Sequence, residues 1–200
     1  MNVMILGGFL GSGKTTCLMQ LARWLVDTSK TDNPNKVMIL ENEIGEVGID
    51  DAFLRGGGFQ VDNLFAGCAC CTVSGELVTA AAKIESEYGP DWLILETTGL
   101  AYPIKIQENL KYAMGIDTRI VVLVDASRWP RLHIPMDNLF RGQIVGSDAV
   151  LINKTDLVTP EALAAVTADI LDYEPKAKVF PVSALKPVEE AVWKEALGLE

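Results

Sequence analysis

Residues 8–15 have the sequence G-F-L-G-S-G-K-T and follow the apolar run Val3–Leu6. In a strand, glycine-rich loop and helix of this kind, successive backbone N–H groups surround the phosphates of a nucleotide. The glycines allow the turn and let the backbone come close to phosphate oxygens. We expect Lys14 to contact the β- and γ-phosphates, Thr15 to bind Mg²⁺, and the helix to add the positive end of its dipole. The predicted phosphate-binding residues are Gly8, Gly11, Ser12, Gly13, Lys14, Thr15 and Thr16.

Composition limits the class of protein. The chain has 200 residues, 49% of them apolar and 22% charged, which suits one globular domain over residues 1–200. Its formal net charge of −10 would repel nucleic-acid phosphates, so we expect no nucleic-acid partner. No run approaches the ~18 apolar residues that cross a bilayer. We recognise no signal peptide and therefore expect a cytoplasmic protein without a membrane partner.

Short apolar runs alternate with helical patterns along the chain. We expect strands at residues 3–6, 37–40, 92–95, 120–124, 149–152 and 179–182, and a short strand at 59–61 within a hairpin. We expect helices at residues 14–27, 74–88, 104–114 and 160–173, the last capped by Thr159. Buried strands alternating with helices predict an α/β fold, the P-loop NTPase three-layer sandwich, with a mostly parallel sheet covered on both faces. Ligands of such sheets bind at the carboxyl ends of the strands.

The third core strand ends in the sequence Glu96-Thr97-Thr98-Gly99. An acidic side chain at that position can support Mg²⁺ beside the phosphates, directly or through water. Gly99 can bring a backbone N–H near the γ-phosphate and act as a hinge that responds to its loss. We therefore predict that Lys14, Thr15, Glu96 and Gly99 carry out the chemistry, with Thr15 and Glu96 at the Mg²⁺ site.

A second polar segment, Asn153-Lys154-Thr155-Asp156, follows a later strand. Guanine offers two adjacent donors that one carboxylate, Asp156, can accept, whereas adenine lacks the ring N–H. A site built on such hydrogen bonds rejects the analogue without them by a factor of up to ~10⁴. The Lys154 stem can lie along the base. The pattern favours GTP, and Ser183 and Ala184 after the last strand suit a contact to the guanine oxygen.

Three of the four cysteines, Cys68, Cys70 and Cys71, lie within four residues. Clustered thiols in a chain of this class indicate metal or redox chemistry rather than disulfides, and thiolates suit Zn²⁺, Cu⁺ or other late metals. A fourth ligand could come from the acidic loop, with Glu41, Glu43 and Glu46 as candidates. Cys17 lies within the first helix and is expected to fill the core.

His133 is the only histidine, and we expect a packing or surface role for it. We likewise expect the four dispersed tryptophans to lie in the core or at an interface.

Five motifs occur in a fixed order along the chain. They are G-G-F-L-G-S-G-K-T-T at residues 7–16, E-N-E-I-G-E-V-G-I-D at 41–50, G-C-A-C-C-T at 67–72, E-T-T-G at 96–99 and N-K-T-D at 153–156. Together they resemble the CobW branch of the metal-chaperone GTPases, a group that also includes UreG and HypB. The resemblance extends from residue 1 to about residue 185.

The resemblance implies a GTPase that delivers a transition metal to a target enzyme or cofactor pathway. It implies that the C-x-C-C segment binds the metal and that the E-N-E-x-G-E loop is a switch. Glu41 and Glu46 would join Cys70 at the metal, with Cys68 and Cys71 as further ligands. It also implies a nucleotide-dependent homodimer. CobW-like proteins often carry a C-terminal domain, so we expect target recognition to be missing here or supplied by a separate protein.

From these motifs we expect GTP binding to close the loop 41–50 and so to change the ligands of the metal. Metal and GTP would then alter each other's affinity equally. Intrinsic hydrolysis should be slow, because no glutamine adjoins Glu96 to orient water, and an arginine finger (Arg55 is a weak candidate) could come from a partner. Thiolates with carboxylates suit Zn²⁺, Co²⁺, Ni²⁺ or Fe²⁺, of which we favour Zn²⁺ or Co²⁺.

Two other functions fit the same residues. The chain could be a regulatory or partner-remodelling GTPase whose cysteines sense metal or redox state. It could also be a nucleotide-dependent helper of corrinoid or other metalloenzyme activation that carries no metal itself. A structural Zn²⁺ that never leaves the cysteines would favour these alternatives. A metal ion that leaves the cysteines only when GTP is present would indicate the chaperone function and exclude both alternatives.

Overall fold

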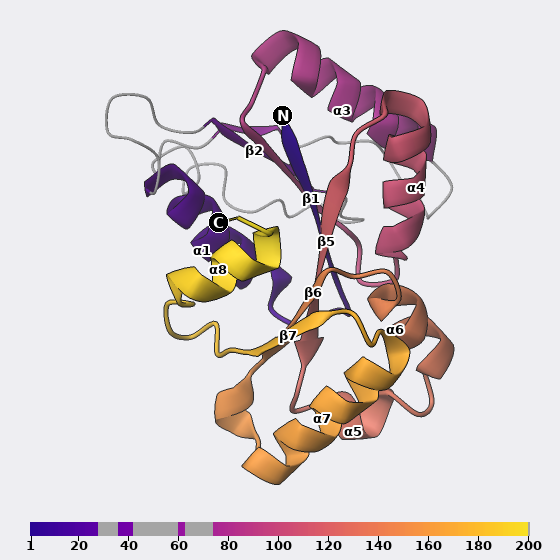
Figure 1. Ribbon diagram of the computed structural model, residues 1–200, viewed down its shortest axis with the longest axis vertical. Coiled ribbons are helices and arrows are strands. Elements are labelled where there is room, and N and C mark those ends of the chain that lie inside the picture. The colour runs from indigo at the N-terminus through magenta and orange to yellow at the C-terminus, as the bar shows by residue number, and fades with distance from the viewer. Residues whose placement is uncertain (28–35, 42–59, 63–73, 200) are drawn as a thin grey trace.

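A parallel sheet forms the centre of the molecule in the computed structural model, which describes residues 1–27, 36–41, 60–62 and 74–199 (Figure 1). The described strands have the order β3-β2-β4-β1-β5-β6-β7, and every neighbouring pair is parallel. Their bounds are β1 Asn2–Gly8, β2 Val37–Glu41, β3 Gln60–Asp62, β4 Trp92–Glu96, β5 Thr118–Asp125, β6 Ala149–Asn153 and β7 Lys178–Pro181.

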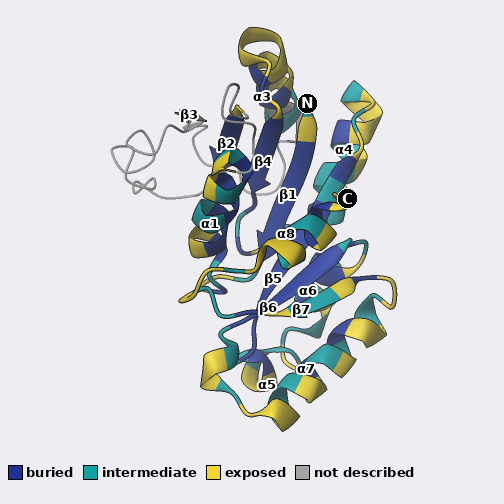
Figure 2. Cartoon of the chain, turned by 60° about the vertical axis from the view of Figure 1, so that its left-hand side comes forward, coloured by how far each residue is buried: buried dark blue, intermediate teal, exposed yellow. Residues whose placement is uncertain are grey.

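Helices cover both faces of the sheet (Figures 1 and 2). On one face lie α1 (Lys14–Asp27) and α8 (Glu190–Leu197). On the other lie α3 (Ser74–Tyr88), α4 (Pro103–Met114), α5 (Trp129–Leu132), α6 (Asp137–Ile144) and α7 (Pro160–Tyr173). A short 3₁₀ helix, η1, spans Thr155–Leu157. Within the described ranges, none of the helices is long and apolar enough to cross a membrane.

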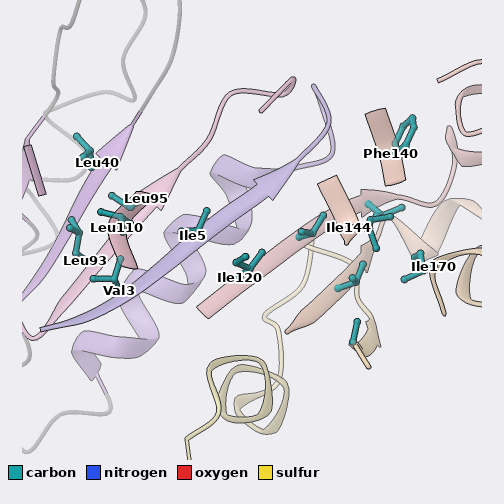
Figure 3. Packing of buried hydrophobic residues seen from close by; sticks show 14 of the residues in the cluster. Val3, Ile5, Leu40, Leu93, Leu95, Leu110, Ile120, Phe140, Ile144 and Ile170 are labelled. Carbon is teal, nitrogen blue, oxygen red and sulfur yellow. The ribbon is translucent and has the colours of Figure 1, made fainter. Parts of the chain in front are cut away.

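The core has two halves because the strands are apolar on both faces. Along β1, Val3 and Ile5 pack toward α3, α4, α6 and α7, whereas Met4 and Leu6 pack toward α1 and α8. Figure 3 shows the first half, from Leu40 on β2 to Ile170 on α7. This burial on both sides explains why the strands are continuous apolar runs rather than alternating ones. Because these strands are parallel, the carboxyl ends of β1, β4, β5 and β6 lie at one edge of the sheet.

The predicted three-layer α/β fold is therefore confirmed, with most of its strands and helices within a few residues of their expected bounds. Pro160 begins α7, and the Thr159 hydroxyl accepts a hydrogen bond from the Ala162 N–H at 3.3 Å, as its capping role predicts. The residues that would form a hairpin with the strand near 59–61 lie outside the described residues. The strand there, β3, pairs in parallel with β2 at the edge of the sheet, and a parallel pair cannot be joined by a tight turn.

Candidate functional site

The loop between β1 and α1 has a backbone that only glycine allows at three positions. The φ angles of Gly8, Gly11 and Gly13 are 138°, 72° and 99°. A Cβ on Gly8 would lie 2.4 Å from the Leu123 carbonyl oxygen, and one on Gly13 would lie 2.4 Å from the Asn153 amide nitrogen. The loop is thus pressed against β5 and β6. The buried Lys14 side chain lies across the loop, with its ammonium 3.1 Å from the Gly8 carbonyl oxygen.

Three consecutive carbonyl groups of this loop accept hydrogen bonds from side chains outside it. The Arg128 guanidinium donates to the Leu10 oxygen, the Lys154 ammonium to the Gly11 oxygen at 2.8 Å, and the Asn153 amide to the Ser12 oxygen at 2.8 Å. Ser12 is buried, so its carbonyl requires such a partner, whereas Leu10 and Gly11 are exposed. Because the carbonyls are held from outside, the loop geometry is fixed by the ends of β5 and β6.

Asp125, the last residue of β5, joins the two cations of this set. Its carboxylate is 6% exposed and accepts hydrogen bonds from Lys154 Nζ at 2.7 Å and from Arg128 Nε at 2.8 Å. It also accepts from the Ser127 hydroxyl at 2.6 Å. Burial alone would raise the pKa of Asp125, but the hydrogen bonds from Lys154, Ser127 and Arg128 outweigh it and lower the pKa to about 2. The carboxylate is therefore ionised at any ordinary pH.

This lowered pKa predicts a loss of stability in acid. The ordinary pKa is 3.8 and the folded value is about 2, so the stabilisation is complete above pH 4 and disappears as the pH falls toward 2. The difference corresponds to roughly 2 kcal/mol of unfolding free energy. We expect urea-unfolding midpoints, measured between pH 5 and pH 3, to fall more steeply for the wild type than for Asp125→Asn. Equal slopes would show that Asp125 has no such effect.

Thr15 and Glu96 lie together at the start of α1 and the end of β4. The Thr15 hydroxyl is 3.5 Å from Glu96 Oε1, and Glu96 is only 3% exposed. Hydroxyl and carboxylate oxygens are the ligands that Mg²⁺ prefers, and this ion usually takes one or two protein oxygens together with phosphate oxygens. The two side chains therefore fit a Mg²⁺ ion beside the phosphate loop.

The turn after β4 touches the phosphate loop at Gly99. A Cβ on Gly99 would lie 2.7 Å from the Leu10 backbone nitrogen and 2.5 Å from Leu10 Cγ, so no larger residue fits without displacing the loop. Lys14, Thr15, Glu96 and Gly99, predicted from separate parts of the sequence, are thus gathered at one edge of the sheet.

The segment after β6 meets the segment after β7. The Asn153 side-chain oxygen accepts hydrogen bonds from the backbone N–H groups of Lys154 at 2.8 Å and Ala184 at 2.9 Å. The Ser183 hydroxyl donates to Asp156 Oδ1 at 2.5 Å, and both residues reach solvent. Lys154 has a φ of 62°, the only positive value among the described non-glycine residues. This conformation places both its N–H and its ammonium in the network.

Helix α1 holds the loop after β7 in place. The Gln20 amide donates to the carbonyl oxygens of Ala184 at 2.8 Å and Lys186 at 3.1 Å, and accepts from the Val188 N–H at 2.9 Å. Thr16 lies on the exposed side of the first turn of α1. The predicted base-contacting and phosphate-contacting residues therefore belong to one continuous hydrogen-bonded surface.

The predicted transition-metal ligands lie largely outside the described residues. Cys68, Cys70, Cys71, Glu43 and Glu46 fall in the ranges that the structure does not describe, as does Arg55. The backbone of Glu41 is described: it ends β2 and is the register partner of Glu96 on β4. Cys17 is buried, as predicted, and burial raises the pKa of its thiol to about 12.

His133 and the tryptophans have packing roles. The His133 ring stacks on Trp129 with centroids 5.5 Å apart, and its Nδ1 lies 2.8 Å from the Trp129 carbonyl oxygen. Trp92, Trp129 and Trp193 are buried.

Sequence reasoning missed four residues that hold the site: Gln20, Asp125, Arg128 and Gln143. Asp125 carries the same signal as Glu96, an acidic residue directly after a buried strand, and that signal could have found it. Arg128 and Gln143 have no local pattern. Gln143, on α6, donates to the Gly99 carbonyl oxygen at 2.8 Å across 44 positions of sequence.

Comparison with known proteins agrees with this geometry. Residues 2–181 match the sequence profile of the CobW/HypB/UreG nucleotide-binding domain. The zinc chaperone YeiR of Escherichia coli is 33% identical over 169 residues, covering 81% of this chain and 49% of YeiR. The zinc-regulated GTPase metalloprotein activator 1 of Schizosaccharomyces pombe is 31% identical over 212 residues, covering 99% of this chain and 50% of the relative. The chain spans about half the length of these curated relatives.

Solved structures support the fold. The hydrogenase maturation factor HypB of Archaeoglobus fulgidus superposes with a TM-score of 0.67 at 18% identity, covering 99% of this chain and 87% of that one. HypB of Helicobacter pylori, solved in complex with nickel, gives 0.63 at 22% identity, covering 99% and 82%. The TM-scores establish the shared architecture, and identities this low carry no conclusion about ligands.

Proposed function

The chain belongs to the CobW/HypB/UreG family of nucleotide-binding domains, and on that premise we propose that it is a GTP-hydrolysing metallochaperone. It binds a transition metal at the C-x-C-C segment and couples GTP binding and hydrolysis to delivery of that metal to a target metalloenzyme or cofactor pathway. The observation that carries the nucleotide half is the surface formed by the phosphate loop, Asn153, Asp156 and Ala184.

Each part of this surface has a role in binding GTP. The backbone N–H groups from Gly11 to Thr16 surround the phosphates, and Lys14 leaves the Gly8 carbonyl to contact the β- and γ-phosphates. Asp156 accepts the two guanine donors while Ser183 keeps its carboxylate oriented. The segment at Ser183 and Ala184 would contact the guanine oxygen, and the Ala184 N–H, which donates to Asn153 Oδ1, holds that segment beside Asn153. Binding of GTP, GDP or neither can be distinguished by calorimetry.

Hydrolysis in this class of enzyme depends on positioning and on charge neutralisation. Thr15 and Glu96 would hold Mg²⁺, which when bound neutralises charge on the phosphate oxygens. Lys14 stabilises charge on the same oxygens, and the turn at Gly99 lies against the loop where the γ-phosphate would sit. We propose a slow intrinsic rate, because none of these residues is placed to orient the attacking water.

The transition metal is cargo rather than a resident cofactor. We propose Cys68, Cys70 and Cys71 as its thiolate ligands, joined by Glu41 and Glu46. Relatives named zinc chaperones favour Zn²⁺, while Co²⁺ has the same ligand preferences. The backbone pairing of Glu41 with Glu96 supports a connection between the two ions, since neighbouring strands lie about 4.8 Å apart.

Replacing Cys70 with serine is expected to weaken Zn²⁺ binding about tenfold or more and to change GTP affinity by less than twofold, because a hydroxyl is a poor substitute for a thiolate. Calorimetry with Zn²⁺ alone and with GTP in the absence of Zn²⁺ measures both. Cys17→Ala is the matched control: it removes a cysteine whose buried thiol does not ionise, and Zn²⁺ affinity should stay unchanged. Equal losses of Zn²⁺ and GTP affinity in Cys70→Ser would contradict separate sites.

The coupling itself is tested by titrating Zn²⁺ with and without bound GTP, and GTP with and without bound Zn²⁺. The ratio of Zn²⁺ affinities with and without GTP must equal the ratio of GTP affinities with and without Zn²⁺. We expect this coupling to be ~1–3 kcal/mol. Zn²⁺ that never transfers to an apo-acceptor with GTP present would favour a regulatory GTPase with a structural zinc site. We propose as partners the acceptor protein and a second copy of the chain in a nucleotide- or metal-dependent dimer, in the cytoplasm.

A further inference from the structure

Gln143 is a buried amide that the nucleotide chemistry above does not use. It lies on α6, is 1% exposed, and donates from Nε2 to the Gly99 carbonyl oxygen at 2.8 Å. A side-chain amide is buried at a cost unless it forms hydrogen bonds, so this contact is specific rather than incidental.

Gly99 is held from two sides. One side is the phosphate loop, since a Cβ on Gly99 would lie 2.7 Å from the Leu10 backbone nitrogen. The other side is the Gln143 amide. The C=O and N–H of a trans peptide unit point in opposite directions. By holding the Gly99 carbonyl toward α6, Gln143 turns the N–H of the next residue, Leu100, away from α6.

Helix α6 contacts the phosphate loop as well as the turn. The Phe140 ring packs on Phe9 of the loop, with centroids 5.4 Å apart. Phe140 and Gln143 are three residues apart and so lie on one face of the helix. A single rigid helix therefore fixes both the loop, through Phe140, and the turn at Gly99, through Gln143.

We propose that Gln143 is a positioning residue that holds the turn after β4 in the conformation that receives the γ-phosphate. The inference rests on the proposed function, because it assigns the turn at Gly99 to the γ-phosphate; the Gln143 contact fixes the Gly99–Leu100 peptide unit of that turn. GDP lacks that phosphate, so Gln143 contributes to the binding of GTP and to its hydrolysis but not to the binding of GDP. Because Gln143 belongs to α6, a movement of the turn would change the contact between the turn and α6.

The test replaces Gln143 with methionine, which keeps the length of the side chain and removes its donor. The buried Gly99 carbonyl then has lost a partner, and this weakens the conformation that the donor supported. We expect kcat for GTP to fall about tenfold or more. The affinity for a GTP analogue that carries an imido group between the β- and γ-phosphates should fall by a similar factor. GDP affinity should change by less than threefold.

Ile144→Ala is the control. Ile144 adjoins Gln143 on α6, is fully buried, and removing its side chain leaves a cavity that lowers thermal stability. It should lower the melting temperature while leaving the ratio of GDP affinity to analogue affinity as in the wild type. If the methionine variant does not fold, Gln143→Asn, which keeps the amide but shortens its reach, is measured in the same way.

The outcomes separate the two proposals. A Gln143 variant that lowers GDP and analogue affinity equally, or changes only the melting temperature as Ile144→Ala does, overturns the positioning role. A wild-type protein that binds neither nucleotide removes the proposed function and this inference with it. Selective loss of analogue binding together with an unchanged Zn²⁺ affinity supports Gln143 whether or not metal delivery is found.

Discussion

Replacing Asp156 with asparagine is expected to lower GTP affinity by about a thousandfold and to raise the affinity for xanthosine triphosphate. The carboxylate would accept both the ring N–H and the exocyclic amine of guanine. Asparagine presents one acceptor and one donor, so it pairs with the ring N–H and the carbonyl oxygen of xanthine instead. The contact from the Ser183 hydroxyl, 2.5 Å long in the wild type, can be kept by the asparagine oxygen. Competition binding with the two nucleotides measures the exchange.

The gain for xanthosine triphosphate is itself the control against misfolding, because an unfolded variant would bind neither nucleotide. Asp156 is exposed, and its replacement should leave the melting temperature nearly unchanged. If both affinities keep their wild-type values, the base lies elsewhere and the assignment of Asp156 is wrong.

Replacing Asp125 with asparagine is expected to lower the unfolding free energy by roughly 2 kcal/mol and to weaken nucleotide binding. Lys154 and Arg128 would lose the buried anion that orients them, and the Leu10 and Gly11 carbonyls would lose well-placed donors. Removing one partner of a fully buried pair costs about 3–5 kcal/mol, and the effect here is smaller because both cations reach solvent. Chemical denaturation and GDP titration measure the two effects.

Asp117→Asn provides the matched control for this substitution. Asp117 pairs with Lys111 on the surface, where both side chains are well exposed, and such pairs contribute about 0–1 kcal/mol. The two variants change the net charge equally, so any difference between them reports the position of Asp125. Similar stabilities in the two variants would be evidence against a structural role for the Asp125 cluster.

The central part of the fold was predictable because its signals are local. Continuous apolar runs such as Ile120–Val124 predicted buried parallel strands, and a proline after a threonine marked the start of α7. The short helices α5, α6 and α8 were not predicted. They are four to eight residues long, and their helical state is set by packing of residues such as Phe140 and Trp193 against the sheet.

The site divides in the same way. The positions of Lys14, Glu96 and Asp156 near the carboxyl edge of the sheet were predictable, because each lies at or after the end of a strand within a recognisable motif. Gln143 and Arg128 were not, since their contacts join positions 44 and 118 residues apart that only the folded chain brings together. The parallel pairing of the short strand near 59–61 with β2 could not be predicted, because a short strand near glycines gives no signal of its partner or pairing direction. The pairing of β3 with β2 follows from the order of the strands in the folded sheet.

Asn153 bonds the Ser12 carbonyl with its nitrogen and the Ala184 N–H with its oxygen. In the proposed GTP site, this one amide therefore sets the spacing between the residues assigned to the base and those assigned to the first two phosphates. Guanosine diphosphate and triphosphate meet the same spacing, so this part of the protein cannot tell them apart. On the proposed assignment, we expect discrimination between the two nucleotides to arise at the turn at Gly99, which lies against Leu10 of the loop.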